Sequence, residues 1–383
     1  MVKVLLKRIF PIAFLKKAFL VYNKLKISTF DKVCYREVVI DPSSFVYKTI
    51  HSPFAGELYS FDELKIRPEF PYLQFWRTWS EDQYILDFKS LCVIEPVHGW
   101  GIKGANGLVY QSLPYSRTDH QKKPDLLAYW NRRSVEKVGF AISFRDTGEE
   151  NYFHFYNDIL TKVKYLKDFG ILLESVKIIV AERLWTKPYF QHMLASSKEL
   201  SGLNWLIQST QYIECERVIF CKAPTHSAGL LTDVFKPLNT SAPKGIRRIF
   251  VTRKRERLRF VDNIDEIERV CQLHHIEIID AGDLTLPQQI ELFSSAALIV
   301  GIHGAGLTNM MFRNGKCKVY EIFAPPDLGY LPFHYAMLAK LKGFEYRAII
   351  GRQPSERFSG GFYVDADSFS SDLDDFINKK ELK

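Results

Sequence analysis

The stretch ALIVGIHGAGLTN, residues 297–309, joins a continuous apolar run to a glycine-rich turn that carries one histidine. The apolar run at 297–302 is typical of a strand buried in a parallel sheet, because such strands are covered on both faces. The turn follows at 303–306, where glycines tolerate a positive φ, and residues 307–312 favour a short helix. This order predicts a strand, a loop and a helix N-terminus at the carboxyl edge of a sheet, where α/β proteins bind ligands.

Strands and helices alternate at short spacing around this stretch. Apolar runs rich in β-branched residues predict further strands at 246–252, 275–282, 318–323 and 345–350. Apolar residues at helical spacing predict helices at 263–274, from Thr285 onward and near 333–342. Thr285 and Gln288 fit a capping box at the start of the second of these helices. The pattern indicates an α/β domain with a parallel sheet.

The first half of the chain is less regular but favours the same class. It contains candidate strands at 91–96, 176–181 and 214–220 and a candidate helix at 152–170. Prolines and glycines between 224 and 245 suggest a boundary. We therefore predict two Rossmann-like domains whose parallel sheets face each other across a cleft. The expected division is a basic amphipathic segment at 1–30, a first domain at 31–240 and a second at 241–383, with the last helix free to pack back on the first domain.

Composition limits the class of protein and its surroundings. The 383 residues are 46% hydrophobic and carry a net charge of +8, which argues against global disorder and favours an anionic partner. The six cysteines form no metal-ligand pattern and lie mostly in apolar runs, which indicates reduced thiols in the cytosol. We expect a cytoplasmic protein that contacts the inner face of the plasma membrane peripherally.

The N-terminus suggests the membrane contact. Residues 1–28 contain seven Lys or Arg, and the first acid is Asp31. The longest uncharged run, 9–15, is far shorter than the roughly 20 residues that span a bilayer. One interpretation is that residues 1–27 lie on an anionic membrane surface. The other is an ordinary solvated first helix, which Pro11 would interrupt.

Two elements at predicted strand ends favour a phosphate site. The backbone of the loop and of the following helix N-terminus can donate to phosphate oxygens, and His303 and Asn309 can add side-chain hydrogen bonds. Glu321, at the end of the next strand, could bind a ribose hydroxyl or simply cap the sheet. The candidate phosphate-binding residues of this loop and helix start are His303, Gly304, Ala305, Gly306, Leu307 and Asn309. The alternative is a glycine turn with a structural histidine.

An arginine-rich segment supplies the second element. The strand at 246–252 runs directly into TRKRERLR, which includes Arg253 and Arg257. Arginine forks match the geometry of a pyrophosphate. A solvated basic loop is the alternative, but two such elements on neighbouring strands favour the phosphate interpretation.

A third cluster, Asn151 to Asp158, lies in the first half. His154 and Asp158 are four residues apart, so on a helix they share one face. Either group, or a carboxylate that orients the imidazole, could deprotonate a hydroxyl. A histidine–aspartate pair on a surface helix would look the same in sequence.

Taken together, three blocks resemble glycosyltransferase family 61. They are NYFHFYND (151–158), FVTRKRERLRFVDNIDEIE (250–268) and LIVGIHGAGLTNMMF (298–312) with YEIF (320–323), and the similarity covers about 145–350. The third block is the most specific. Thr252 stands where the family usually has Ser, and Asn263-Ile264-Asp265 stands where Asn-Glu is usual.

The resemblance implies a GT-B fold, a nucleotide-sugar donor that is usually a UDP-sugar, inversion at the anomeric carbon, and no metal or other cofactor. A DxD pair, Asp365 and Asp367, fits a helix cap better than a metal site. The resemblance also requires a catalytic base in the first domain. Asp158 is our first candidate and His154 the second.

Other polar residues of the first domain could lie on the acceptor side. Asn151, Glu95, His98 and Asp146 are the candidates. The function that this sequence predicts is transfer of a sugar to a glycan or lipid-linked acceptor during surface polysaccharide synthesis. The alternative is a non-catalytic nucleotide- or glycan-binding protein of the same fold. A nucleic-acid partner is not expected, because no RNA or DNA motif accompanies the basic segments.

Overall fold

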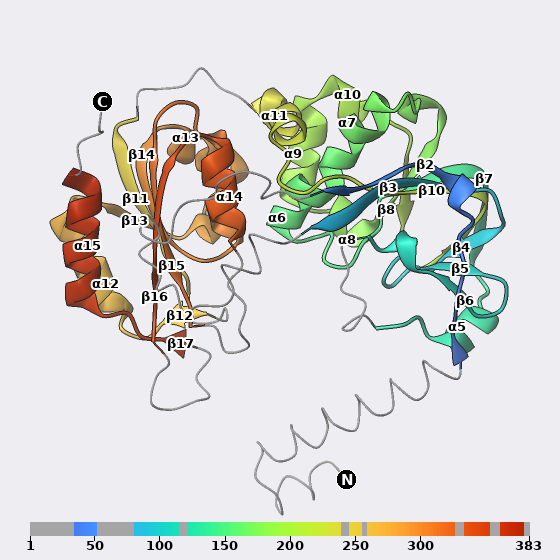
Figure 1. The fold of residues 1–383 in the computed structure, drawn as a ribbon, viewed down its shortest axis with the longest axis horizontal. Coiled ribbons are helices and arrows are strands. Elements are labelled where there is room, and N and C mark those ends of the chain that lie inside the picture. The colour runs from blue at the N-terminus through green and yellow to red at the C-terminus, as the bar shows by residue number, and fades with distance from the viewer. Residues whose placement is uncertain are drawn as a thin grey trace, which may run out of the picture.

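The computed structural model describes residues 34–51, 80–114, 122–238, 245–254, 259–325, 333–352 and 361–378. Within these ranges the chain forms two lobes, each built around its own sheet (Figure 1). The expected boundary at 240/241 and the basic segment at 1–30 lie outside the described residues, so both stay predictions. No helix in the described ranges is long and apolar enough to cross a bilayer. All six cysteines are free thiols, as the sequence indicated.

The second lobe confirms the predicted parallel α/β arrangement. Its five-stranded sheet has the order β13-β11-β14-β15-β16, and every neighbouring pair is parallel. The strands are β11 (Arg247–Val251), β13 (Glu277–Ile279), β14 (Ala296–Ile302), β15 (Lys318–Phe323) and β16 (Glu345–Ile350). The short strands β12 (Phe260–Val261) and β17 (Gly361–Phe362) form a separate pair.

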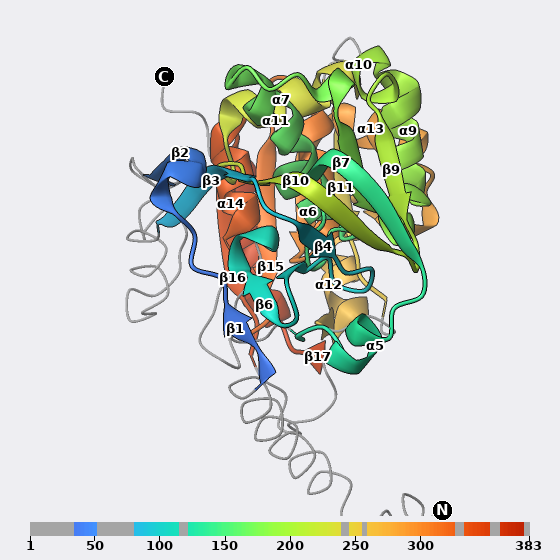
Figure 2. The ribbon, with the colours of Figure 1, turned by 90° about the vertical axis from the view of Figure 1, so that its right-hand side faces the viewer.

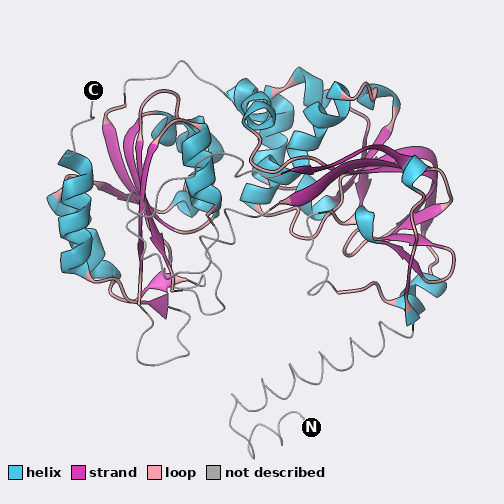
Figure 3. Ribbon diagram, in the orientation of Figure 1, coloured by secondary structure: helices cyan, strands magenta, loops and turns pink. Residues whose placement is uncertain are grey.

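Helices cover both faces of this sheet (Figure 3). α13 (Leu286–Ser294), the 3-10 helix η7 (Ala305–Phe312) and α14 (His334–Leu341) lie on the face toward the first lobe, and α12 (Ile264–Leu273) and α15 (Ala366–Asn378) lie on the outer face. Alternate strand residues therefore enter different cores: Ile249 faces inward and Phe250 outward, and Ile299 and Val300 do the same. This double burial explains the continuous apolar runs. The predicted capping box at Thr285 begins α13.

The last helix packs on the second lobe, which corrects the expectation that it could return to the first. Phe369, Leu373 and Phe376 of α15 belong to the outer core of the second sheet. The hydroxyl of Tyr320 on β15 donates to Asp372 at 2.7 Å. The apolar stripe of α15 thus covers a sheet face that would otherwise be exposed.

The first lobe carries a ten-stranded sheet of mixed direction, so the expected parallel sheet is wrong here. β10 pairs in parallel with β7, and β8 continues the parallel part to β9, but β3 and β4 both run antiparallel to β10. The neighbouring pairs β4–β5 and β5–β6 are also antiparallel, because the short turns that join them can connect only antiparallel strands. The strands are β1 (Arg36–Glu37), β2 (Phe45–His51), β3 (Glu81–Phe88), β4 (Cys92–Ile94), β5 (Gly101–Lys103), β6 (Gly107–Val109), β7 (Val135–Ser143), β8 (Lys177–Ala181), β9 (Trp205–Gln208) and β10 (Tyr212–Lys222).

The helices of the first lobe lie mainly on one side of this sheet, as Figures 1 and 2 both show for α7, α9 and α11. They are α5 (Leu126–Trp130), α6 (Tyr152–His154), a π-helical turn (Phe155–Leu160), α7 (Thr161–Asp168), α8 (Glu182–Trp185), α9 (Pro188–Ser196), α10 (Lys198–Ser201) and α11 (Ala228–Phe235). The predicted helix at 152–170 is therefore present, with a π-helical turn in its middle. Such turns are common at functional sites.

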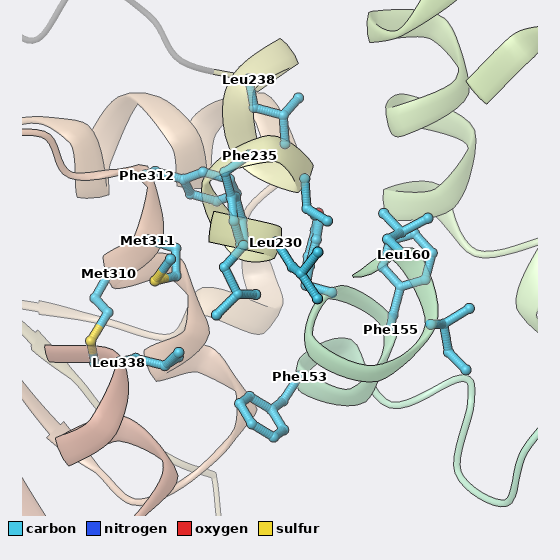
Figure 4. Packing of buried hydrophobic residues seen from close by; sticks show 14 of the residues in the cluster. Phe153, Phe155, Leu160, Leu230, Phe235, Leu238, Met310, Met311, Phe312 and Leu338 are labelled. Atoms are coloured by element: carbon cyan, nitrogen blue, oxygen red, sulfur yellow. The ribbon is translucent and has the colours of Figure 1, made fainter. Parts of the chain in front are cut away.

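One hydrophobic core joins the two lobes (Figure 4). Phe153 and Phe155 of the first lobe belong to the same core as Met310 and Leu338 of the second. The ring of Phe235 on α11 meets the ring of Phe312 on η7 at a centroid distance of 5.4 Å. The junction is therefore a packed contact that holds the helix of His154 against the loop of His303.

Candidate active site

His303 follows the last residue of β14 and is buried at the carboxyl edge of the second sheet. Its ring stacks on Phe323 at a centroid distance of 5.2 Å, and the ring of Tyr335 on α14 lies at the same distance. Glu321 on β15 contacts Nδ1 of His303 at 2.5 Å. The hydroxyl of Tyr346 on β16 donates to the other carboxyl oxygen of Glu321 at 2.5 Å. Four elements of the second lobe thus fix the orientation of one imidazole.

Burial decides the protonation of this pair. Burial, followed by the positive charges of Arg259 and Arg253, lowers the pKa of His303 well below its ordinary value. Burial raises the pKa of Glu321 to about 8, although the hydrogen bond from Tyr346 acts in the opposite direction. At neutral pH the carboxyl keeps its proton and the imidazole is neutral. Because Nδ1 faces that proton, the imidazole N–H lies on Nε2 and can donate to an anion.

The glycines of the loop allow close approach between side chains and backbone. A Cβ at Gly304 would lie 2.3 Å from Nη1 of Arg253, and a Cβ at Gly301 would lie 2.5 Å from Leu307. The φ angle of Gly304 is 168°, which is extended backbone. The expected positive-φ turn conformation is therefore wrong for this glycine, and an added Cβ would instead require the end of the Arg253 side chain to move.

Positive charge gathers at this edge of the sheet. Nη1 of Arg253 donates to the backbone carbonyl of His303 at 3.4 Å. Arg259 lies close enough to His303 to influence its pKa, so both arginines surround the same imidazole. Arg257 lies outside the described residues, and its role stays a prediction. Arg253, Arg259 and the N–H of His303 form a set of donors suited to a diphosphate.

Asn309 joins the two lobes. Its carbonyl oxygen accepts from the hydroxyl of Tyr152 on α6 at 2.6 Å, and its amide nitrogen donates to Gln289 on α13 at 2.8 Å. Both ends of the amide therefore already have a protein partner, which the sequence did not indicate. The predicted short helix after the loop is present as η7, and Ala305 and Leu307 belong to it.

A cavity of about 500 Å³ opens beside this loop, between the lobes. Most of its lining side chains are aromatic or aliphatic, and both lobes contribute. The lining residues are Tyr152, Pro188, Tyr189, His192, Ala281, Gly282, Leu284, Thr285, Leu286, Pro287, Gln289, Ala305, Gly306 and Asn309. Ligand sites of proteins commonly have about 300–1,000 Å³ and a lining of this kind.

His154 and Asp158 form the second histidine–carboxylate pair. Nδ1 of His154 lies 2.5 Å from Oδ2 of Asp158, which confirms that the two share one face of the helix. The side chain of His154 is 43% exposed and that of Asp158 only 5%. Burial lowers the pKa of His154, but the hydrogen bond and charge of Asp158 outweigh it, so this pKa is raised. The accessible basic atom of the pair is Nε2 of His154.

Aromatic rings connect the two pairs across the lobe junction. Phe153 lies next to His154, at a centroid distance of 5.3 Å, and meets Tyr335 at 5.7 Å. Tyr335 in turn contacts the ring of His303. A series of ring contacts therefore links the base candidate of the first lobe to the anion-binding candidate of the second lobe.

The remaining acceptor-side candidates mostly have structural partners. The Asn151 side chain caps α6, where it accepts from the backbone N–H of Phe153 at 2.9 Å. Glu95 accepts from the backbone N–H groups of Val97 and His98 at 2.7 and 2.5 Å. The carboxamide of Asn151 thus stabilises the start of α6, and the carboxylate of Glu95 stabilises a turn. These structural roles account for both residues without a part in catalysis.

His98 and Asp146 lie in loops of the first lobe. Burial is the main cause that lowers the pKa of His98. Asp146 follows β7 and is buried, and its charge helps raise the pKa of His154. Asp146 therefore belongs to the surroundings of His154. Asp365 accepts from the backbone N–H of Ser368 at 2.8 Å at the start of α15, which confirms the predicted helix cap.

Sequence reasoning did not identify Tyr335, Tyr346 or Phe323 as part of the site. They lie in elements that were predicted as ordinary helix or strand, and only the sheet order places them against His303. No group of three His, Cys, Asp or Glu side chains that could hold a metal occurs in the described part of the chain. Metal independence stays a prediction.

Comparison with known proteins supports the same region. The family model of glycosyltransferase 61 matches residues 152–320. The EGF domain-specific O-linked N-acetylglucosamine transferase of Drosophila melanogaster is 24% identical over 140 residues, which cover 34% of this chain and 26% of that protein. The β-1,2-xylosyltransferase of Arabidopsis thaliana is 30% identical over 66 residues, 17% of this chain and 12% of the relative.

The chain thus spans about a quarter or less of the length of these two relatives. The matched region contains His154, Asp158, Arg253 and His303, the residues that the structure brings to the lobe junction. Residues 152–320 of this chain belong to the glycosyltransferase 61 family.

Proposed function

We propose that this chain is an inverting glycosyltransferase of GT-B type, which moves a sugar from a UDP-sugar to a hydroxyl of a glycan or lipid-linked saccharide. The observation that carries the proposal is that two histidine–carboxyl pairs, which differ in burial and in the pKa of the histidine, lie on either side of the same lobe junction. One pair is buried and neutral beside two arginines, and the other is half-exposed and basic. This division suits a donor side and an acceptor side.

On the donor side, the diphosphate would lie at the loop after β14. Arg253, Arg259 and Nε2–H of His303 would neutralise the charge that develops on the leaving phosphate oxygen. Ala305 and Gly306 of the same loop line the cavity, so the nucleoside would occupy the cavity while the diphosphate reaches the arginines. The aromatic lining, including Tyr152 and Tyr189, offers flat surfaces for a base.

On the acceptor side, the geometry favours His154 as the general base and Asp158 as its partner. This reverses our initial order of the two candidates, because Asp158 is buried and its oxygens already accept from Asn157 and His154. In the reaction, Nε2 of His154 takes the proton of the acceptor hydroxyl. The acceptor oxygen then bonds to the anomeric carbon from the face opposite the diphosphate. The bond from that carbon to phosphate breaks, and its electron pair leaves with UDP.

The cellular setting is a further part of the proposal. A cytoplasmic enzyme of surface polysaccharide synthesis would work at the inner face of the plasma membrane. The seven basic residues of 1–28 supply the charge for peripheral contact with anionic lipids. A truncated chain that starts at residue 28 and still binds anionic vesicles like the full chain would refute this role.

Donor turnover tests the function. The purified full chain should release UDP from one or more UDP-sugars, faster when a saccharide acceptor is present, and it should do so in excess EDTA. The His154→Ala variant should still bind UDP but should form UDP from the UDP-sugar only slowly. Nucleotide binding without any release by the unaltered chain would favour the non-catalytic alternative. Activity that requires added Mg²⁺ or Mn²⁺ would refute the metal-independent mechanism.

A further inference from the structure

A chain of hydrogen bonds continues behind the His154–Asp158 pair, through buried groups. The backbone N–H of His226 donates to Oδ1 of Asn157 at 3.0 Å. Nδ2 of Asn157 donates to Oδ1 of Asp158 at 2.6 Å. The other oxygen of Asp158 meets Nδ1 of His154 at 2.5 Å. Asn157 and Asp158 are both at most 3% exposed, so protein groups hold this arrangement.

The donor and acceptor of every hydrogen bond in this series follow from the first donor, the backbone N–H of His226. A backbone N–H can only donate, so the atom of Asn157 that faces His226 must be the amide oxygen. The amide NH₂ must then face Asp158, where it donates to Oδ1. A carboxylate accepts only, so Nδ1 of His154 carries the proton that faces Oδ2. In neutral His154 this leaves Nε2 unprotonated.

We propose that Asn157 is a positioning residue that fixes the tautomer of His154 through Asp158, an inference that rests on the proposed role of His154 as the base. Only the tautomer with a bare Nε2 can accept a proton from the acceptor hydroxyl. An apolar residue at position 157 would leave Asp158 free to turn, and the two tautomers of His154 would mix.

The first donor of the chain is itself held by the second lobe. His226 adopts a φ of 51°, a left-handed conformation that residues other than glycine seldom adopt. Its ring stacks on His334 at the start of α14, with a centroid distance of 5.2 Å and 9° between the planes. Nε2 of His226 and Nδ1 of His334 lie 3.1 Å apart. Contact between the lobes therefore keeps the N–H of His226 directed at Asn157.

The charged and titratable groups around His154 come from several elements. Asp158 lies on its own helix, and Asp146 from the loop after β7 also raises the pKa of His154. The rings of His226 and His334 both contact the ring of Phe153, which neighbours His154. Asn157 carries no charge, and its side chain reaches this set through Asp158 on one side and the backbone N–H of His226 on the other.

The first test reads the tautomer directly in the full chain without substrate. Nitrogen NMR of ¹⁵N-histidine-labelled protein should show His154 with a protonated Nδ1 and a bare Nε2 once it is neutral. In Asn157→Leu the signals should shift toward a mixture of both tautomers. Thr161→Val is the matched control, because Thr161 is also buried and its hydroxyl donates to the backbone carbonyl of Asn157 at 2.7 Å, not to the side chain. It should leave His154 unchanged.

Kinetics supply the second test. Asn157→Leu should lower kcat about tenfold, the effect of one lost hydrogen bond to a charged group, without a change in KM for the donor.

Asn157→Asp keeps an acceptor for the N–H of His226, so it should fold even if the leucine variant does not. Two adjacent carboxyl groups cannot both ionise easily, so one pKa is raised. The introduced carboxyl group can donate to Asp158 only while it holds its proton. This contact is therefore lost as pH rises, and the variant should lose activity where the unaltered enzyme gains it.

The outcomes separate the inference from the function. A bare Nδ1 in the unaltered chain, or an unchanged tautomer and kcat in a folded Asn157→Leu, would overturn the positioning role. A normal pH profile for Asn157→Asp would do the same. If the chain shows no donor turnover but the tautomer mixes in Asn157→Leu, the positioning role stands and the transferase function fails.

Discussion

The two histidine–carboxylate pairs of this protein share one contact and differ in almost everything else. In both, a carboxyl oxygen lies 2.5 Å from Nδ1 of the imidazole. The His303 side chain is 8% exposed and the His154 side chain 43%. Beside His303 stand Arg253 and Arg259, and beside His154 stand Asp158 and Asp146. Burial and neighbouring positive charge lower one pKa, whereas neighbouring negative charge raises the other.

The contrast shows that the surroundings of the pair decide its chemistry. A neutral imidazole with a fixed Nε2–H is a hydrogen-bond donor that costs little to bury next to a diphosphate. A half-exposed imidazole with a raised pKa is a base that meets solvent and substrate. Each prediction below alters one pair or a group beside it and leaves the other pair in place.

The largest expected effect follows from removal of the base. His154→Ala should lower kcat about 10²–10⁴-fold, the usual contribution of general base catalysis, while KM for the donor stays unchanged. Steady-state release of UDP measures both constants. His274→Ala serves as the control, because His274 lies near Asp374 of α15 on the outer face of the second lobe. This variant should behave as the unaltered enzyme. Normal turnover by a folded His154→Ala would mean that the base lies elsewhere.

The partner of the base should matter less than the base. Asp158→Ala should lower kcat about 10–100-fold, as is typical for partners that orient a functional histidine. Because the negative charge that raises the pKa of His154 is gone, the acid limb of the kcat profile should move to lower pH. A pH profile across the acid and neutral range tests this. An acid limb that stays in place would show that Asp158 does not act on His154.

The close contact of Gly304 with Arg253 predicts a smaller effect on the donor side. Gly304→Ala forces the guanidinium away, since the added Cβ would lie 2.3 Å from Nη1. We expect UDP to bind about tenfold more weakly, because a hydrogen bond to a charged group contributes about 1.5–3 kcal/mol. Gly139→Ala is the control, as its Cβ would meet nothing closer than 3.9 Å. Equal affinity in both variants would place the diphosphate away from Arg253.

The smallest effect concerns stability. The pKa of Glu321 is raised from 4.5 to about 8, and that of His303 is lowered from 6.5. Between pH 4.5 and 6.5 the folded and unfolded forms of this pair hold equal numbers of protons, so its contribution is flat. From pH 6.5 to 8 the folded form holds one more, and stability should fall by about 1–2 kcal/mol. The free energy of unfolding, measured with urea at several pH values, should not fall between pH 6.5 and 8 in Glu321→Gln as it does in the unaltered chain. An unchanged pH dependence would contradict a protonated Glu321.

The second lobe could be predicted from sequence almost element by element. Its strands are buried on both faces and its helices carry one apolar face, so periodicity identifies each. β15 and β16 lie at the predicted 318–323 and 345–350. In the first lobe, the alternation of strands and helices is lost because β2 pairs with β3, and β4, β5 and β6 pair in sequence, all antiparallel, and local composition does not determine strand direction.

The site was predictable where one local segment supplies the residues, and not where tertiary packing does. His154 with Asp158, and His303 with its loop, are visible as spacing. The assignment of Asp158 as the first candidate base did not anticipate that Asp158 is buried and accepts from Asn157, which itself accepts from the N–H of His226. The phosphate role of Asn309 stays a prediction, and sequence did not reveal that its amide oxygen accepts from Tyr152 across the lobes. No local pattern encodes such contacts.

Calorimetric titration of UDP into two variants tests the central claim most directly. The account assigns His303 to the donor and His154 to the acceptor, although a carboxyl oxygen lies 2.5 Å from Nδ1 of each imidazole. UDP should bind His154→Ala as it binds the unaltered chain. It should bind His303→Ala at least about tenfold more weakly, as expected for loss of a hydrogen bond to a charged group. Equal UDP affinities in both folded variants, or a loss only in His154→Ala, would contradict this division of the site.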